Sequence, residues 1–135
     1  MSAHVDTFLA SLKRCLATQD FLHRFYDRFT ESSEEVREKF KKTEFPRQTR
    51  VLADSLYALA VAVQGASEGP GWRELDRLAE RHDRRNLDIR PELYDTWLEC
   101  LISTARDFDP EMSADVESAW RQTLAVGIER MRSRH

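Results

Sequence analysis

Residues 21–40 read FLHRFYDRFTESSEEVREKF and carry the repeating pattern from which the fold class follows. In their first half, apolar and aromatic side chains recur three and four positions apart, which is the spacing of one face of an α-helix. These side chains are Phe21, Leu22, Phe25, Tyr26 and Phe29. Ser32 then lies three residues before Glu35, a pair that favours a new helix because the hydroxyl can accept from an exposed backbone N–H. We therefore expect one amphipathic helix, followed by a short helix that stops near residues 41–43.

Helical spacing continues on both sides of this stretch. Upstream, one apolar face runs from Val5 to Leu16, and the polar residues 18–20 are expected to form a bend. Downstream, Pro46 suits the first turn of a long helix, because the N–H that proline lacks would have no helical partner there. The apolar positions of that long helix are Val51, Leu52, Leu56, Leu59 and Val63.

The second half of the chain indicates three more helices. A brief helix over residues 72–79 leads to His82, and another covers residues 94–102 until Asp109-Pro110 breaks it. Ser113 can cap the last helix. With only 4 glycines and 4 prolines to interrupt the helical spacing, and with no internal repeat, we expect an all-α fold of about seven helices.

Composition and charge indicate an ordinary globular protein. Its 21 basic and 24 acidic residues are mixed along the chain and sum to a net charge of −3, which argues against a nucleic-acid partner. Cys15 and Cys100 lie far apart with no CxxC pairing, as expected of free thiols in a reducing compartment. No apolar run approaches the ~18 residues of a membrane span, and no secretion signal is evident. We expect a single cytoplasmic domain over residues 1–135, with no membrane partner.

His82 is the candidate metal ligand among the four histidines. A neutral imidazole near the end of a helix leaves open space for a metal in front of the ring, and Leu78 one turn earlier could pack beneath a flat cofactor. His4 and His135 are terminal, and His23 lies on the polar side of its helix. Taken alone, His82 could equally be a surface histidine or a hydrogen-bonded core residue, so its spacing to other residues matters.

That spacing resembles the globin family, most closely the bacterial flavohaemoglobins and single-domain haemoglobins. The resemblance covers nearly the whole chain and is carried by residues 21–40, by PRQTRVL at 46–52, and by LAERH and IRPELY at 78–94. Its most specific part is RFYDRF, with Phe40 fourteen residues after the tyrosine and a histidine forty-two residues further on. It implies a globin-like fold around a pocket for haem b.

On the distal side, the resemblance makes Tyr26 and Gln48 the polar residues that face a gas ligand. It makes Phe40 the aromatic residue that packs flat against the porphyrin, and Leu52 an apolar residue that crowds the ligand. From the residues alone, Tyr26 could be a core aromatic and Gln48 a solvated helix residue. The pair is more informative, because a phenol and an amide can both donate to a ligand that gains partial negative charge.

On the proximal side, the resemblance makes His82 the iron ligand. It places Leu78 and Ile89 against the cofactor and makes Tyr94 the tyrosine that contacts the proximal imidazole, although the segment between His82 and Tyr94 is about two residues longer than in the family. Flavohaemoglobins also carry a glutamate late in the last helix, a position that lies past the end of this sequence, and Glu129 is a turn or more too early. Without that carboxylate, the electron push that splits an O–O bond is weaker.

Three arginines lie close to the expected proximal side, at positions 84, 85 and 90. Arg84, Arg85 and Arg90 could pair with haem propionates, or they could belong to a solvated basic loop.

The resemblance implies a haem protein that binds O2 reversibly, with NO and CO as further ligands, at a site that is six-coordinate when occupied. Oxygen binding or transport is the expected function, so the chain is expected to be a ligand-binding protein rather than an enzyme. One alternative is nitric oxide dioxygenation, in which O2 and NO give nitrate and an external reductase restores ferrous iron. The other is a gas-sensing module. The sequence leaves the oligomeric state open.

Overall fold

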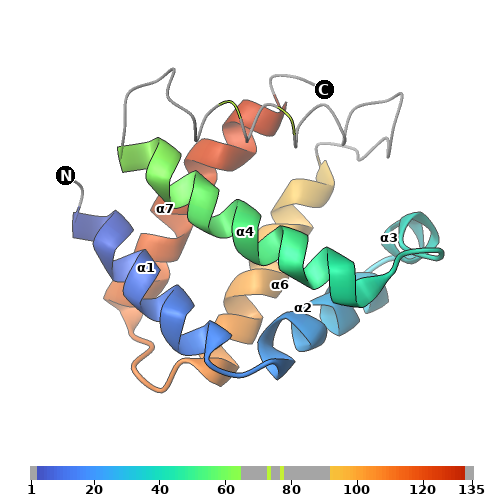
Figure 1. Ribbon diagram of the computed structural model, residues 1–135, viewed down its shortest axis with the longest axis horizontal. Helices are drawn as coiled ribbons and strands as arrows, with labels where there is room; N and C mark the ends of the chain where they lie inside the picture. The colour runs from blue at the N-terminus through green and yellow to red at the C-terminus, as the bar shows by residue number, and fades with distance from the viewer. Residues whose placement is uncertain (1–2, 65–72, 74–76, 78–91, 133–135) are drawn as a thin grey trace.

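The fold of the described residues is all-helical (Figure 1). The computed structural model describes residues 3–64, 73, 77 and 92–132, and this part of the chain contains no strand. The helices are α1 (Ala3–Leu16), α2 (Asp20–Glu31), α3 (Glu34–Lys39), α4 (Phe45–Gln64), α6 (Glu92–Phe108) and α7 (Ala114–Arg132). Six of the seven expected helices are thus confirmed. The expected helix over residues 72–79 lies outside the described residues, except for positions 73 and 77.

The helices pack in two groups that are joined by the contacts of α6 with α1 and α7. On one side α1 and α4 both pack against α7 and contact each other, and Figure 1 shows α7 running across the direction of these two helices. On the other side α2 packs against α6 and carries α3 at its far end. The amphipathic faces predicted from the sequence are the faces that meet, because burying them removes their apolar surface from water. As a result, α2 and the beginning of α4 lie together near α3.

Aromatic side chains from three helices fill the base of the core. Trp120 of α7 is fully buried, with its ring centroid 4.8 Å from that of Phe8 and 6.3 Å from that of Phe21, both in edge-to-face arrangements. Its indole Nε1–H donates to Ser11 Oγ at 2.8 Å. An indole N–H in an apolar core needs such an acceptor. The contacts join α1, α2 and α7.

The turn between α6 and α7 is tied to α1 by Asp109. The sequence predicted this residue only as part of a helix break, and the break is confirmed because α6 ends at Phe108. Its carboxylate is buried and accepts hydrogen bonds from Ser11 Oγ at 2.5 Å, Arg14 Nε at 2.6 Å and the backbone N–H of Glu111 at 2.8 Å. Asp109 therefore contributes to tertiary packing as well as ending a helix.

The helix ends show one error in the sequence prediction and two confirmations. Ser33, not Ser32, caps α3, because its hydroxyl accepts from Val36 N at 3.1 Å while Ser32 Oγ donates back to Phe29 O at 2.6 Å. Because the Ser32 hydroxyl is bonded to the last turn of α2, the hydroxyl that caps α3 is that of Ser33. Pro46 lies in the first turn of α4 as expected. Ser113 accepts from Val116 N at 3.2 Å and caps α7.

A close helix approach holds α4 against α7. Gly127 of α7 faces Leu59, and a Cβ atom at this glycine would lie 2.7 Å from Leu59 Cδ1. Leu59 is buried, so it cannot move aside into solvent. Glycine therefore allows α4 to lie closer to α7 than a larger residue would.

Gly127→Val is expected to lower the free energy of unfolding by about 1–3 kcal/mol, because the added side chain overpacks the contact with Leu59. Urea unfolding followed by circular dichroism measures the change. Ala125→Val on the exposed side of the same helix is the control, since it introduces the same β-branched residue without that contact. Equal urea midpoints of unfolding for the two variants would show that the contact between position 127 and Leu59 is not tightly packed.

None of the helices in the described ranges is both long and apolar enough to cross a lipid bilayer.

Candidate functional site

Tyr26 is the polar member of the buried face of α2. The side chains on this face are Phe21, Leu22, Phe25, Tyr26 and Phe29. Tyr26 is 4% exposed, and its ring lies 4.9 Å from that of Phe25. A buried phenol requires a partner for its hydroxyl group, since an unpaired polar group in an apolar surrounding costs free energy.

That partner is Gln48, which α4 brings to Tyr26. The Gln48 Nε2 amide donates to Tyr26 Oη at 3.0 Å. Because the phenol oxygen accepts in this bond, its own hydrogen remains available to donate to a third group. The structure thus brings together the two residues that the sequence proposed as a polar pair, although they lie 22 positions apart.

The environment of Tyr26 keeps its hydroxyl protonated. Burial raises the pKa of the phenol above its ordinary value, and the hydrogen bond from Gln48 opposes this increase only in part. At neutral pH the group is therefore an O–H donor and not a phenolate. Together with Gln48, it forms a neutral pair that can stabilise a partial negative charge.

Two further aromatic rings enclose Tyr26 at the junction of α3 and α4. Phe40 follows α3 and Phe45 begins α4, and their ring centroids lie 5.7 and 5.4 Å from that of Tyr26. The two phenylalanine rings stack on each other at 6.4 Å with an interplanar angle of 27°. Both remain partly exposed. They form an aromatic surface beside the hydroxyl–amide pair.

Phe45 was not among the site residues proposed from the sequence. The signal that could have found it is its position three residues before Gln48, because residues three apart lie on the same face of a helix. Leu52, which the sequence did propose, is buried one turn after Gln48 on α4. The first two turns of α4 therefore supply Phe45, Gln48 and Leu52 to the site.

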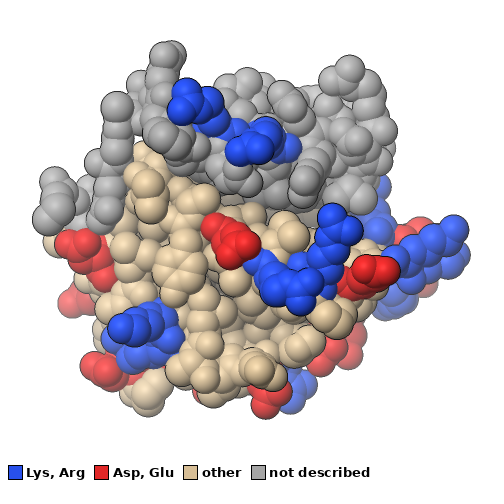
Figure 2. Space-filling model, viewed as in Figure 1, with Lys and Arg blue, Asp and Glu red and all other residues tan. Residues whose placement is uncertain are grey.

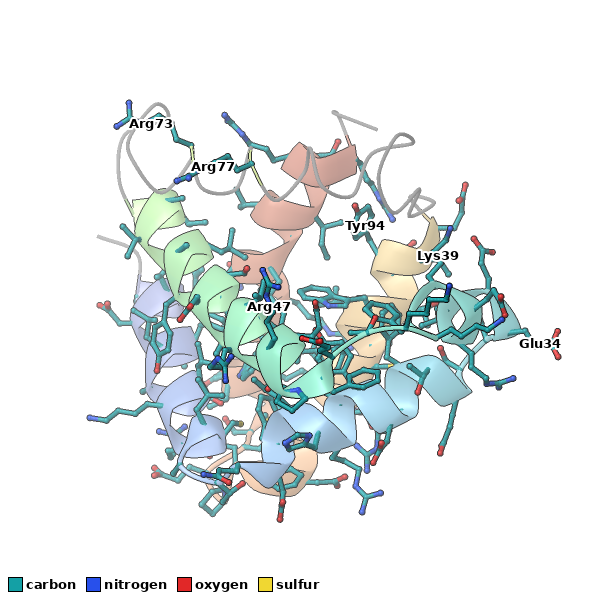
Figure 3. All side chains as sticks on the ribbon, turned by 45° about the vertical axis from the view of Figure 1, so that its right-hand side comes forward. Glu34, Lys39, Arg47, Arg73, Arg77 and Tyr94 are labelled. Carbon is teal, nitrogen blue, oxygen red and sulfur yellow. The ribbon has the colours of Figure 1, made fainter. Side chains whose placement is uncertain are left out.

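Tyr94 lies at the start of α6, right of centre and below Arg73 and Arg77 in Figure 3. It is buried, and burial raises the pKa of its phenol to about 12, although the charge of nearby Arg132 acts in the opposite direction. Arg132 also pairs with Asp95, with 2.7 Å between Nη2 and Oδ1. A positive side chain near the end of α7 thus lies close to Tyr94. Glu129 is exposed on the same helix.

The proposed proximal residues other than Tyr94 lie outside the described residues. These are His82, Leu78, Ile89, Arg84, Arg85 and Arg90. Of the other histidines, His23 is exposed on α2 and His4 is half-buried in the first turn of α1. Within residues 3–64, 73, 77 and 92–132, no three His, Cys, Asp or Glu side chains form a group able to hold a metal ion.

The surface around the site carries both signs of charge. Figure 2 shows lysine and arginine side chains interspersed with acidic ones over the described part of this face. Arg47, which precedes Gln48, is exposed and projects from α4 in Figure 3. The hydroxyl–amide pair is therefore electrically neutral but lies close to exposed positive charge.

Comparisons with known proteins give one informative similarity. No protein-family profile matches the chain, and no curated protein sequence matches it. A solved crystal structure does match: a protein from Pseudomonas aeruginosa PAO1 that is described as structurally highly homologous to a human hemoglobin. The chain is 34% identical to that protein and superposes on it with a TM-score of 0.90, over 97% of each chain.

Proposed function

Because this chain belongs to the globin family, we propose that it binds haem b and reversibly binds O2, with NO and CO as further ligands. His82 is the proposed iron ligand, and Tyr26 and Gln48 are the proposed distal residues. The protein from Pseudomonas aeruginosa supports the proposal through its likeness to a hemoglobin over the whole fold. Oxygen binding or transport is the function that we propose for this chain.

The observation that carries the proposal is the direction of the hydrogen bond between Gln48 and Tyr26. Since Gln48 Nε2 donates and Tyr26 Oη accepts, the phenol O–H remains free to donate to a ligand beside it. Diatomic ligands that gain partial negative charge are stabilised by such a donor.

The side chains around this pair fit a flat apolar cofactor. Phe40 and Phe45 are partly exposed, so they offer aromatic surface against which a porphyrin can pack. Bound haem would supply a ferrous iron that coordinates diatomic gases. Tyr26 would then orient and stabilise the gas through its O–H, Gln48 would hold Tyr26, and Leu52 would exclude water. Leu78, Ile89 and Tyr94 are proposed to complete the cofactor contacts.

Two of the remaining histidines are placed unfavourably for the role assigned to His82. His23 is exposed on the outer side of α2, and His4 is in the first turn of α1. We also propose a cytoplasmic location, which the two free cysteines support.

An absorption spectrum tests the proposal directly. The protein supplied with haem is expected to show a Soret band that shifts reversibly when O2 is added to the ferrous form and removed again. His82→Ala should abolish the histidine-ligated spectrum, because it removes the proposed iron ligand. His23→Ala is the matched control and should leave the spectrum unchanged. A protein without a Soret band, or His82→Ala protein with an unaltered one, would refute the assignment.

The same preparation distinguishes the two other functions. Rapid mixing of the oxygenated protein with NO would give nitrate once and leave ferric iron even in an oxygen carrier. A dioxygenase would instead continue to form nitrate when an external reductase restores the ferrous iron. A gas sensor would instead change its affinity for a partner protein between the ligand-free and oxygenated states. Reversible O2 binding with neither effect is the result that we expect for a carrier.

A further inference from the structure

We propose that Phe45 is a positioning residue that, together with Gln48, fixes the place of the Tyr26 phenol and thereby slows the release of the gas ligand. This inference rests on the proposed function of the site. It adds a residue to which the globin resemblance assigned no role. It also means that the first turn of α4 fixes the position of the Tyr26 side chain, which belongs to α2.

The first turn of α4 holds Tyr26 at two points. Phe45 contacts the aromatic ring, with 5.4 Å between ring centroids and an angle of 58° between the planes. Gln48 contacts the hydroxyl group through its amide at 3.0 Å. The two residues are three positions apart, so a single helical face supplies both contacts. A ring held only at its oxygen could still tilt about that hydrogen bond, whereas the second contact resists the tilt.

The other rings against Tyr26 do not supply this second contact from α4. Phe25 lies on α2 with Tyr26, and Phe40 lies in the segment between α3 and α4. Phe45 stacks on Phe40, so it also holds that neighbouring ring in place. Within the described residues, Phe45 is therefore the residue of α4 whose ring contacts the ring of Tyr26.

The contact with Phe45 also contributes to the burial of the phenol ring. Tyr26 is 4% exposed, whereas Phe45, which contacts its ring, is partly exposed at the start of α4. Water that reached Tyr26 Oη would compete for the O–H that the gas ligand needs, and a hydrogen bond is stronger where water is excluded. A smaller side chain at position 45 would thus weaken ligand retention both by loosening the ring and by admitting water.

A double-mutant cycle on the haem-loaded protein tests the inference. Phe45→Leu is expected to raise the O2 dissociation rate about three- to tenfold in the wild-type background. In a Tyr26→Phe background it should add less than about 1.5-fold, because the residue acts through the phenol that is already missing. Phe45→Tyr keeps the ring and should restore a rate close to that of the wild type.

A spectroscopic signature separates positioning from a purely structural role. The C–O stretching frequency of the carbon monoxide complex responds to the distal donor, so Phe45→Leu should shift it towards the value of Tyr26→Phe. Phe108→Leu is the control, because Phe108 is also a partly buried ring but contacts Phe21 and not Tyr26. It should change neither the frequency nor the O2 dissociation rate.

The outcomes distinguish this inference from the proposed function. If haem and O2 bind but Phe45→Leu leaves both readouts unchanged, or acts equally with and without the Tyr26 hydroxyl, the role of Phe45 is wrong and the proposed function stands. If no haem binds, the proposed function fails. The haem-free protein then still reports on the contact, because Phe45→Leu should shift the 13C resonance of Tyr26 Cζ and leave that of Tyr94 in place. An unshifted Tyr26 resonance would overturn the contact itself.

Discussion

Tyr26→Phe is expected to raise the O2 dissociation rate of the haem-loaded protein by roughly 10- to 150-fold. This factor corresponds to the loss of one hydrogen bond to a partly charged group. The variant keeps the aromatic ring and its contacts with Phe40 and Phe45, and removes only the O–H. The Gln48 amide loses its acceptor, but Gln48 is partly exposed, so water can replace that partner. The increase therefore measures the donor itself. Stopped-flow replacement of O2 by CO gives the rate.

Tyr57→Phe is the matched control for this substitution. Tyr57 lies on the outer side of α4 and is 40% exposed, so the loss of its hydroxyl should not alter the rate. CO develops less charge than O2, and its dissociation from the Tyr26→Phe protein should change much less. An O2 dissociation rate that is equal in Tyr26→Phe and Tyr57→Phe would show that Tyr26 is a structural residue with no contact to the ligand.

Asp109→Ala is expected to lower the free energy of unfolding by about 2–4 kcal/mol, somewhat less than for a fully buried ion pair because Arg14 is partly exposed. The side chain of Asp109 is 0% exposed and that of Arg14 is 26% exposed. The substitution also leaves the buried Ser11 hydroxyl without its acceptor, and that hydroxyl supports Trp120. Urea unfolding at pH 7 measures the change. The control is Asp107→Ala, which removes the exposed partner of Arg28 and should cost about 0–1 kcal/mol.

The contribution of Asp109 should disappear in acid. Burial by itself would raise the pKa of its carboxyl group, but hydrogen bonds from Arg14, Ser11 and the Glu111 N–H, with the charge of Arg14, outweigh burial and lower the pKa. The stability is therefore fully present above the unfolded-state pKa of about 3.9, and it is lost as the pH falls through the lower pKa of the folded state. The difference in unfolding free energy between wild type and Asp109→Ala should shrink over that range. A difference that stayed constant down to pH 2 would contradict this account.

The residues that the sequence placed correctly are those whose signal is local. The apolar face of α2 and the proline at the start of α4 follow from spacing within a few residues, because a helix brings neighbours three and four positions apart onto one side. Local pattern was insufficient at Ser32 and Ser33, since either serine can cap a helix. The choice between them depends on where α2 ends. Tyr26 and Gln48 were paired through the resemblance to globins, and no local rule relates residues on different helices.

The amino-acid order alone thus specifies the all-α class, the limits of most helices and the resemblance to a family. Tertiary packing decides that Gln48 donates to Tyr26, that Phe45 contacts the ring of the same tyrosine, and that Asp109 is buried rather than exposed at a turn. The partners of Asp109 are 98 and 95 positions away in the chain. Such contacts form only when whole helices meet, because the direction of a side chain within its own helix does not determine which other helix it faces.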